Sequence, residues 1–195
     1  MLALLNRALL CAALAGAVQP PSLAAQLDGA IPSMRLASGT LSFDGHATVG
    51  DFTGATTTVT GEMTGGESLA AVRGWVESPV KTLDTGDGKR DKDLNKSMES
   101  SKHPAMRFEL AGVTPESAGR DTAAVQLRGK LTLHGVTRDV TLPGRVWKDG
   151  GALRLRSDFP LDLGDYDIGG LTKLLGMLRM HEGIEVHVDL TFAPR

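Results

Sequence analysis

The sequence predicts an all-β domain of about eight antiparallel strands with one or two short helices, the strand count of a small closed barrel or a sandwich. Several segments alternate apolar and polar residues with a period of two, which is typical of half-buried strands. The 195 residues include 24 Gly, and many Gly with many Val and Thr favour strands and turns over a helical bundle. The 21 basic and 23 acidic residues nearly balance, which argues against a nucleic-acid-binding protein.

Residues 1–25 predict a secretory signal peptide. Arg7 supplies the positive charge, residues 8–18 form an uncharged apolar run, and residues 22–24 place small side chains at the cleavage positions. The run is too short to span a membrane. We therefore expect one exported domain over residues 26–195. The only cysteine lies in the predicted leader, so we expect a domain without disulfides.

The first predicted strands are the weaker ones. Residues 34–43 and 53–64 are rich in Thr, Ser and Gly. Residues 71–78, 106–110 and 153–159 each place apolar side chains on one face. Short connections between such segments indicate antiparallel pairing.

The clearest strands are residues 125–133 and 184–192. Both alternate strictly, and the first leads through a tight His134-Gly135 turn into a further strand over residues 138–147. Their polar faces carry charged residues, which the lumen of a small membrane barrel would have to bury. We therefore expect a soluble barrel, not one that spans a membrane, with its apolar face inward.

Two segments break the strand pattern. Residues 90–99 are polar and helix-compatible, and Pro104 bars extension of that helix. In residues 171–180 four leucines fall at helical spacing and form one apolar face: Leu171, Leu174, Leu175 and Leu178. A helix this short is unstable alone. We expect it to dock on an open end of the barrel, either as a gate or as a fixed part of the core.

Residue types that carry chemistry form no recognisable motif. The five histidines contain no HExxH pattern, and a single cysteine excludes paired-cysteine zinc motifs. Residues 91–95 resemble the start of a calcium loop, but Lys96 occupies the position of its glycine. No serine lies in a GxSxG turn. We expect no catalytic residue, no cofactor and no metal.

Glycines interrupt the inward apolar face at Gly74 and Gly129. Small residues there leave volume unfilled, and an unfilled apolar interior binds apolar ligands. The alternative is a packed core in which the glycines relieve strand curvature.

Five sequence blocks follow one another between residues 35 and 192. They are FDGH at 43–46 with GDFTG at 50–54, TLDTG at 82–86 with Arg90-Asp91, KHP at 102–104, GKLTLHGVTR at 129–138, and RSDF at 156–159. In this order and spacing they resemble the YceI family of lipid- or polyisoprenoid-binding proteins of the bacterial periplasm. The chain departs from the family pattern at Pro160, where glycine is common.

The resemblance implies a lipocalin-like antiparallel eight-stranded β-barrel around an elongated apolar pocket, in a periplasmic protein. We expect a non-enzymatic protein that carries or sequesters a long-chain apolar ligand: a polyisoprenoid, a quinone or a fatty acyl lipid. Two alternatives stay open, a lipid-directed hydrolase using the same pocket and an interaction scaffold with a filled barrel. A homodimer is a further option.

The residues expected to bind the ligand project from the inward faces and from the leucine-rich segment. They are Phe43, Phe52, Val76, Leu127, Leu131, Leu133, Phe159, Leu171, Leu174, Leu175, Leu178, Val186 and Val188. Lys89, Arg90 and Lys92 follow the turn at residues 84–86. We expect them either to meet an anionic headgroup at the barrel mouth or to form a solvated charge run.

Overall fold

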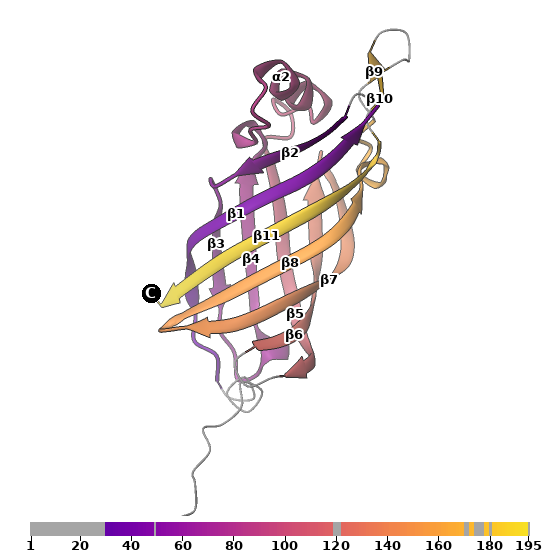
Figure 1. Ribbon diagram of the computed structural model, residues 1–195. Helices are drawn as coiled ribbons and strands as arrows, with labels where there is room; N and C mark the ends of the chain where they lie inside the picture. The colour runs from indigo at the N-terminus through magenta and orange to yellow at the C-terminus, as the bar shows by residue number, and fades with distance from the viewer. Residues whose placement is uncertain are drawn as a thin grey trace, which may run out of the picture.

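An antiparallel sheet closes on itself to form a barrel in the computed structural model (Figure 1). The structure describes residues 30–48, 50–118, 122–169, 172–173, 178–179 and 181–194. The strands are β1 (Met34–Ala47), β2 (Gly50–Thr56), β3 (Thr60–Thr64), β4 (Arg73–Pro79), β5 (Ala105–Ala118), β6 (Thr122–Leu133), β7 (Val136–Asp149), β8 (Ala152–Asp162), β9 (Thr172–Lys173), β10 (Leu178–Arg179) and β11 (Gly183–Pro194). The helices are α2 (Gly88–Ser97) and the 3₁₀ turns η1 (Leu69–Ala71), η2 (Val80–Thr82) and η3 (Leu163–Tyr166).

The strand order is β11-β8-β7-β6-β5-β4-β3-β1-β2, and a pairing of β11 with β1 closes the wall. β2 and β3 pair with different parts of β1 on the same side and together occupy one position in the wall. The closed barrel therefore counts eight strands. This confirms the predicted all-β barrel. The signal-peptide prediction concerns residues 1–25, which lie outside the described residues.

The alternation in β6 and β11 is confirmed. Every second residue of β6 from Ala123 to Leu133 is buried, and the residues between them are half-buried or exposed. In β11 the buried residues are Ile184, Val186, Leu190 and Phe192. The apolar face therefore points into the barrel, as the pattern predicts.

The single strand predicted over residues 53–64 is wrong, because the chain leaves the ladder at residues 57–59. β2 pairs with the C-terminal half of β1, whereas β3 meets only the first two residues of β1. Between them the amide of Thr58 donates to Oγ1 of Thr56 at 3.1 Å. Such local side-chain bonds compete with the hydrogen bonds of the sheet. Composition alone does not show at which residues they replace strand pairing.

β5 extends well beyond the predicted residues 106–110. Its pairing with β6 shifts register between Leu110 and Gly112 and again between Pro115 and Ser117. Each bulge inserts an extra residue and reverses the alternation of faces. The period-two pattern therefore stops at the first bulge although the strand continues.

Two aromatic rings cover two glycines across β1 and β2. Phe43 lies opposite Gly54, and Gly45 lies opposite Phe52. A Cβ on Gly45 would stand 2.7 Å from the Phe52 ring, and one on Gly54 would meet the Phe43 ring. The rings contact each other edge-to-face with centroids 6.0 Å apart. This reciprocal packing accounts for the spacing of the FDGH and GDFTG blocks.

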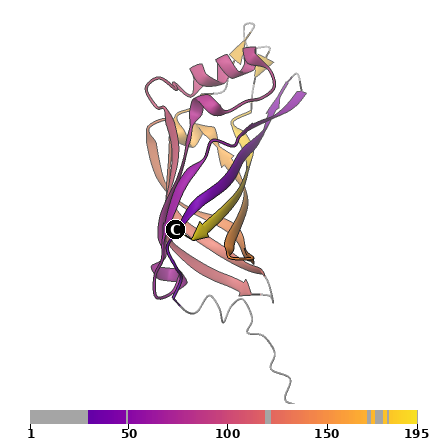
Figure 2. The ribbon, with the colours of Figure 1, turned by 90° about the vertical axis from the view of Figure 1, so that its left-hand side faces the viewer.

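The helix predicted near residues 90–99 is confirmed as α2, which lies across one end of the barrel (Figures 1 and 2). Asp87 caps its N-terminus by accepting bonds from the amides of Lys89 and Arg90 at 2.8 and 3.2 Å. Both bonds lower the pKa of Asp87, and the bond from the Arg90 amide is the larger cause. Leu94 and Met98 turn the apolar side of α2 into the barrel core.

The helix predicted over residues 171–180 is wrong. Its described residues form a two-stranded ladder in which Leu178 pairs with Lys173 and Arg179 with Thr172. Leu171, Leu174 and Leu175 lie outside the described residues. A short helix needs an apolar surface to dock on, but α2 and η3 already cover this end of the barrel. Cross-strand bonds satisfy the backbone of the four described residues without such a surface.

Candidate functional site

A cavity of about 500 Å³ occupies the barrel interior. Ligand pockets commonly measure about 300–1,000 Å³ and are lined mostly by apolar side chains with few polar groups, and this cavity matches both features. The residues predicted from the barrel strands all line it: Phe43, Phe52, Val76, Leu127, Leu131, Leu133, Phe159, Val186 and Val188.

Sequence reasoning missed the two ends of the cavity. At the α2 end, Leu94 and Met98 line it together with Leu83 and Ile168. Leu94 and Met98, the C-cap residue of α2, stand at i and i+4 in an otherwise polar segment, which is a detectable signal for one inward face. At the opposite end the lining includes Met34, Met63, Val72, Leu190 and Phe192. Of these, Leu190 and Phe192 share the predicted inward face of β11.

The two inward glycines have different surroundings. Gly74 lines the cavity, but a Cβ there would stand 2.6 Å from the carbonyl oxygen of Glu62 on β3. A Cβ on Gly129 would meet the backbone of β5 and lie 2.7 Å from the Phe108 ring. Both glycines thus permit close approach of neighbouring strands. The cavity arises from the closure of the wall and not from the missing side chain of Gly129.

Arg90 brings a positive charge to the α2 end of the cavity. Its Nε donates to Oγ1 of Thr85 and its Nη2 to the Thr85 carbonyl, both at 2.9 Å. The guanidinium carbon lies 4.5 Å from the centroid of the Phe52 ring. Asp91 accepts bonds from the amide and hydroxyl of Thr85 at 3.0 and 2.6 Å. Arg90 is therefore held by its neighbours with donors left over for a ligand.

Lys89 and Lys92 lie elsewhere on α2. Both are exposed, and neither is among the residues that line the cavity. Of the three predicted headgroup residues, the structure brings only Arg90 to the cavity.

Three serines of the cavity wall bond to the backbone of the barrel. The hydroxyls of Ser78, Ser97 and Ser157 donate to the backbone carbonyls of Thr58, Gly169 and Pro143. A nucleophilic serine needs an adjacent base. Among the described residues, the histidines all lie outside the cavity lining. The arrangement accommodates an apolar molecule and leaves these hydroxyls bonded to the barrel itself.

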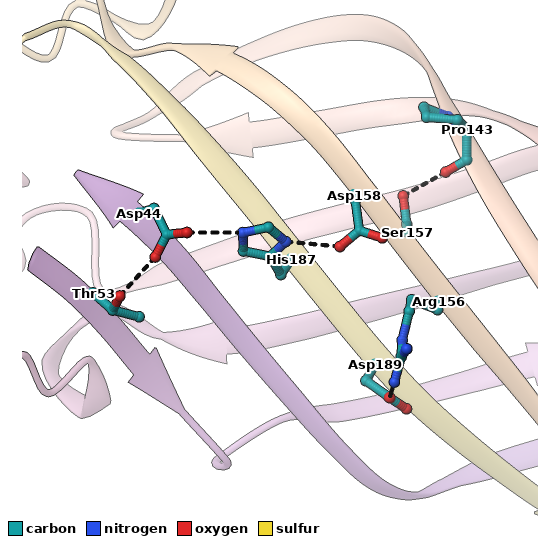
Figure 3. A network of polar contacts seen from close by, with 8 residues as sticks. All are labelled: Asp44, Thr53, Pro143, Arg156, Ser157, Asp158, His187 and Asp189. Carbon is teal, nitrogen blue, oxygen red and sulfur yellow. Dashed lines mark hydrogen bonds and ion pairs between the residues drawn. The ribbon is translucent and has the colours of Figure 1, made fainter. Parts of the chain in front are cut away.

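A polar network crosses the outside of the barrel where β1 and β11 meet (Figure 3). Nδ1 of His187 is 2.7 Å from Asp158 on β8, and its Nε2 is 3.2 Å from Asp44 on β1. Thr53 on β2 donates to the other oxygen of Asp44 at 2.6 Å. Hydrogen bonding to Asp158, followed by that to Asp44, raises the pKa of His187. The bond from Thr53 is the largest cause that lowers the pKa of Asp44.

A profile of the YceI-like domain matches residues 34–192. The chain belongs to the YceI-like family. The match covers the barrel from the first residue of β1 to near the end of β11. A search of curated protein sequences finds no match.

Three solved structures share the fold. BcnA of Burkholderia cenocepacia is 16% identical, with a TM-score of 0.68 over 78% of this chain and 95% of BcnA. A polyisoprenoid-binding domain from Saccharophagus degradans, implicated in plant cell wall breakdown, is 14% identical, with a TM-score of 0.67 over 83% and 98% of the two chains. The Campylobacter jejuni YCEI protein is 15% identical, with a TM-score of 0.55 over 71% and 82%.

Within the described part of the chain, every helix is too short or too polar to cross a membrane.

The His187 network predicts a pH dependence of stability. A raised folded-state pKa stabilises the fold below the unfolded value of about 6.5, and this contribution disappears as pH rises through the folded value. Because the groups are substantially exposed, we expect His187→Gln to lower the melting temperature by about 1–4 °C at pH 6. The difference from wild type should shrink as the pH rises through the raised folded-state pKa of His187. Thermal unfolding across this range tests it, and a difference independent of pH would contradict the assignment.

Proposed function

We propose that this protein is a non-enzymatic binding protein that holds a long-chain apolar molecule inside its barrel. The observation that carries the proposal is the cavity of about 500 Å³ with its predominantly apolar lining. The ligand class we propose is a polyisoprenoid, a quinone or a fatty acyl lipid. The polyisoprenoid-binding domain of Saccharophagus degradans, which shares the fold, supports this class.

The bonding of the wall serines favours a carrier or sequestering role over a lipid hydrolase. The hydroxyls of Ser78, Ser97 and Ser157 donate to backbone carbonyls, which cannot act as the general base that a nucleophilic serine needs. The size of the cavity favours a carrier over a scaffold with a filled barrel. Native mass spectrometry of protein purified without detergent, followed by extraction of the bound material, tests all three. A co-purifying intact lipid supports the carrier, whereas cleaved products or an unoccupied barrel that takes up no lipid would contradict it.

We also propose that the domain is exported to the periplasm. Support comes from the charge, apolar run and small residues of the first 25 positions. N-terminal sequencing of protein recovered from a periplasmic extract should show a start near Ala25 or Gln26. Protein found there with Met1 intact would contradict cleavage.

Filling the cavity should remove the ligand without unfolding the protein. Val188 lines the cavity and is only half-buried, so Val188→Phe adds apolar volume where there is space for it. We expect retained lipid to fall at least several-fold while the melting temperature stays within a few degrees of wild type. Lipid retention equal to wild type, measured by native mass spectrometry, would place the ligand elsewhere.

A charged side chain at position 131 provides a second test of whether the ligand occupies the cavity. Leu131 is 9% exposed and lines the cavity, so Leu131→Lys buries an unpaired ammonium and should cost both ligand and stability. Thr132→Lys is the matched control, because Thr132 points to the outer face of the same strand. The control should retain wild-type lipid content.

Arg90 should select for an anionic headgroup. A charge-assisted bond contributes about 1.5–3 kcal/mol, so wild type should bind a prenyl phosphate about 10- to 150-fold more tightly than the prenol of equal length. Arg90→Gln should abolish this preference, and Lys92→Gln, on the exposed side of the same helix, should keep it. Equal affinities of the wild-type protein for the two amphiphiles would rule out a headgroup role for Arg90.

A further inference from the structure

Three side chains that the proposed lipid site does not use converge beside the α2 end of the barrel. Glu99 and His103 belong to the turn after α2, and His134 belongs to the turn between β6 and β7. Their candidate ligand atoms all lie within 4.8 Å of one another. Oε2 of Glu99 is 3.7 Å from Nε2 of His134 and 3.9 Å from Nε2 of His103. The two imidazole rings meet at 69° with centroids 5.0 Å apart.

The bonding of His134 leaves one ring nitrogen facing this cluster. Nδ1 lies 3.2 Å from the carbonyl oxygen of Tyr166, which only accepts, so Nδ1 carries the proton and Nε2 presents a lone pair. Nε2 is shielded from solvent and has no hydrogen-bond partner within the described part of the chain. A buried acceptor without a partner is costly. Metal-binding histidines show this arrangement, with the second ring nitrogen bonded to a carbonyl or carboxylate.

The backbone places Glu99 and His134 at a conformational cost. Their φ angles are 43° and 50°, in the left-handed region that favours glycine. Glu99 follows the C-cap residue of α2, a position where glycine is the usual choice. His134 precedes Gly135 in a two-residue hairpin turn, where asparagine or glycine is favoured. Side chains kept in such conformations cluster at functional sites.

His103 is held in place by its surroundings. Its amide donates to the Glu99 carbonyl at 3.0 Å, which fixes the turn that carries both residues. Its ring lies over Gly135, where a Cβ would collide with it. The two histidines and the carboxylate therefore come from a rigid turn and a rigid hairpin.

We propose that Glu99, His103 and His134 form a binding site for a divalent transition-metal ion of the zinc class. Two imidazoles and a carboxylate suit zinc and its neighbours, whereas Mg²⁺ and Ca²⁺ prefer oxygen ligands. Ligands bonded at about 2.0–2.1 Å in a tetrahedral site stand about 3.3 Å apart. The side chains of Glu99 and His103 are partly exposed, and they would have to rotate on their fixed backbone to reach that spacing. Three protein ligands leave the fourth position of such a site open to water.

The ion would connect three segments that cover the same end of the barrel. Glu99 and His103 lie at the end of α2, and His134 lies on the β6–β7 hairpin. The Tyr166 carbonyl ties His134 to η3. The site is independent of the lipid proposal, because none of its three ligands lines the cavity.

Lys102 opposes the ion in a measurable way. Its ammonium lies 3.0 and 3.1 Å from the two Glu99 oxygens, so it competes with a cation for that carboxylate. Removing this exposed lysine should therefore tighten metal binding, the opposite of the effect of removing a ligand.

Titration calorimetry on untagged, chelator-treated full-length protein tests the site, with Zn²⁺ added in the presence of millimolar Mg²⁺. We expect saturation at one ion per chain with a micromolar or lower Kd. Glu99→Gly and His134→Asn place residues that tolerate left-handed backbone at both positions, so the metal-free variants should melt no lower than wild type. Each should weaken binding on the order of 100-fold, since losing even an outer partner of a metal ligand costs 10–100-fold.

Two further variants complete the test. Lys102→Gln should tighten binding several-fold. His46→Gln should leave binding unchanged, because His46 is a surface histidine 2.8 Å from the Asp51 carboxylate and distinct from the cluster. Absence of saturable binding by wild type would overturn the site. Equal affinities for wild type, Glu99→Gly and His134→Asn would assign any bound Zn²⁺ to the surface and overturn it as well.

Discussion

The pairing between β1 and β11 determines the rest of the structure, because it turns a sheet into a barrel. Ten residue pairs join the two strands, from Met34 with Pro194 to Asp44 with Glu185. Without this ladder the sheet would end in two open edges, and the apolar side chains that now face inward would face water. The cavity therefore depends on contacts between the first and last strands of the wall. The His187 network spans the same seam on the outside and adds charge-assisted bonds to those of the backbone.

The α2 end of the barrel is organised around aromatic rings. Phe52 packs over Gly45, contacts Phe43 at its edge and stacks under the Arg90 guanidinium. Thr85 then links Arg90 and Asp91 to the chain entering α2. Residues from separate sequence blocks are thus joined in one continuous cluster. The cluster joins the two blocks at residues 43–54 and 82–91, which lie apart in the sequence.

The sequence predicts best where one periodic signal decides the structure. In β6 and β11 strict alternation determines the strand, its faces and the residues that line the cavity. It predicts least where local and distant interactions compete, as at the break between β2 and β3 and at the bulges of β5. The leucine pattern of residues 171–180 indicates a helix only if an apolar surface is available, and α2 and η3 already cover that surface. The cluster of Glu99, His103 and His134 has no sequence signature, because a hairpin turn and a helix terminus far apart in the chain supply its members.

The register of the closing ladder also determines where the ends of the domain lie. Met34 and Pro194 are paired neighbours on one rim, and α2 covers the opposite rim (Figure 1). Chain ends that meet on adjacent strands allow circular permutation, since a short linker joins them while every inward side chain keeps its place. Any segment attached before Met34 or after Pro194 leaves from that same rim. A tether attached at this rim would leave α2 and Arg90 at the end of the barrel farthest from the attachment.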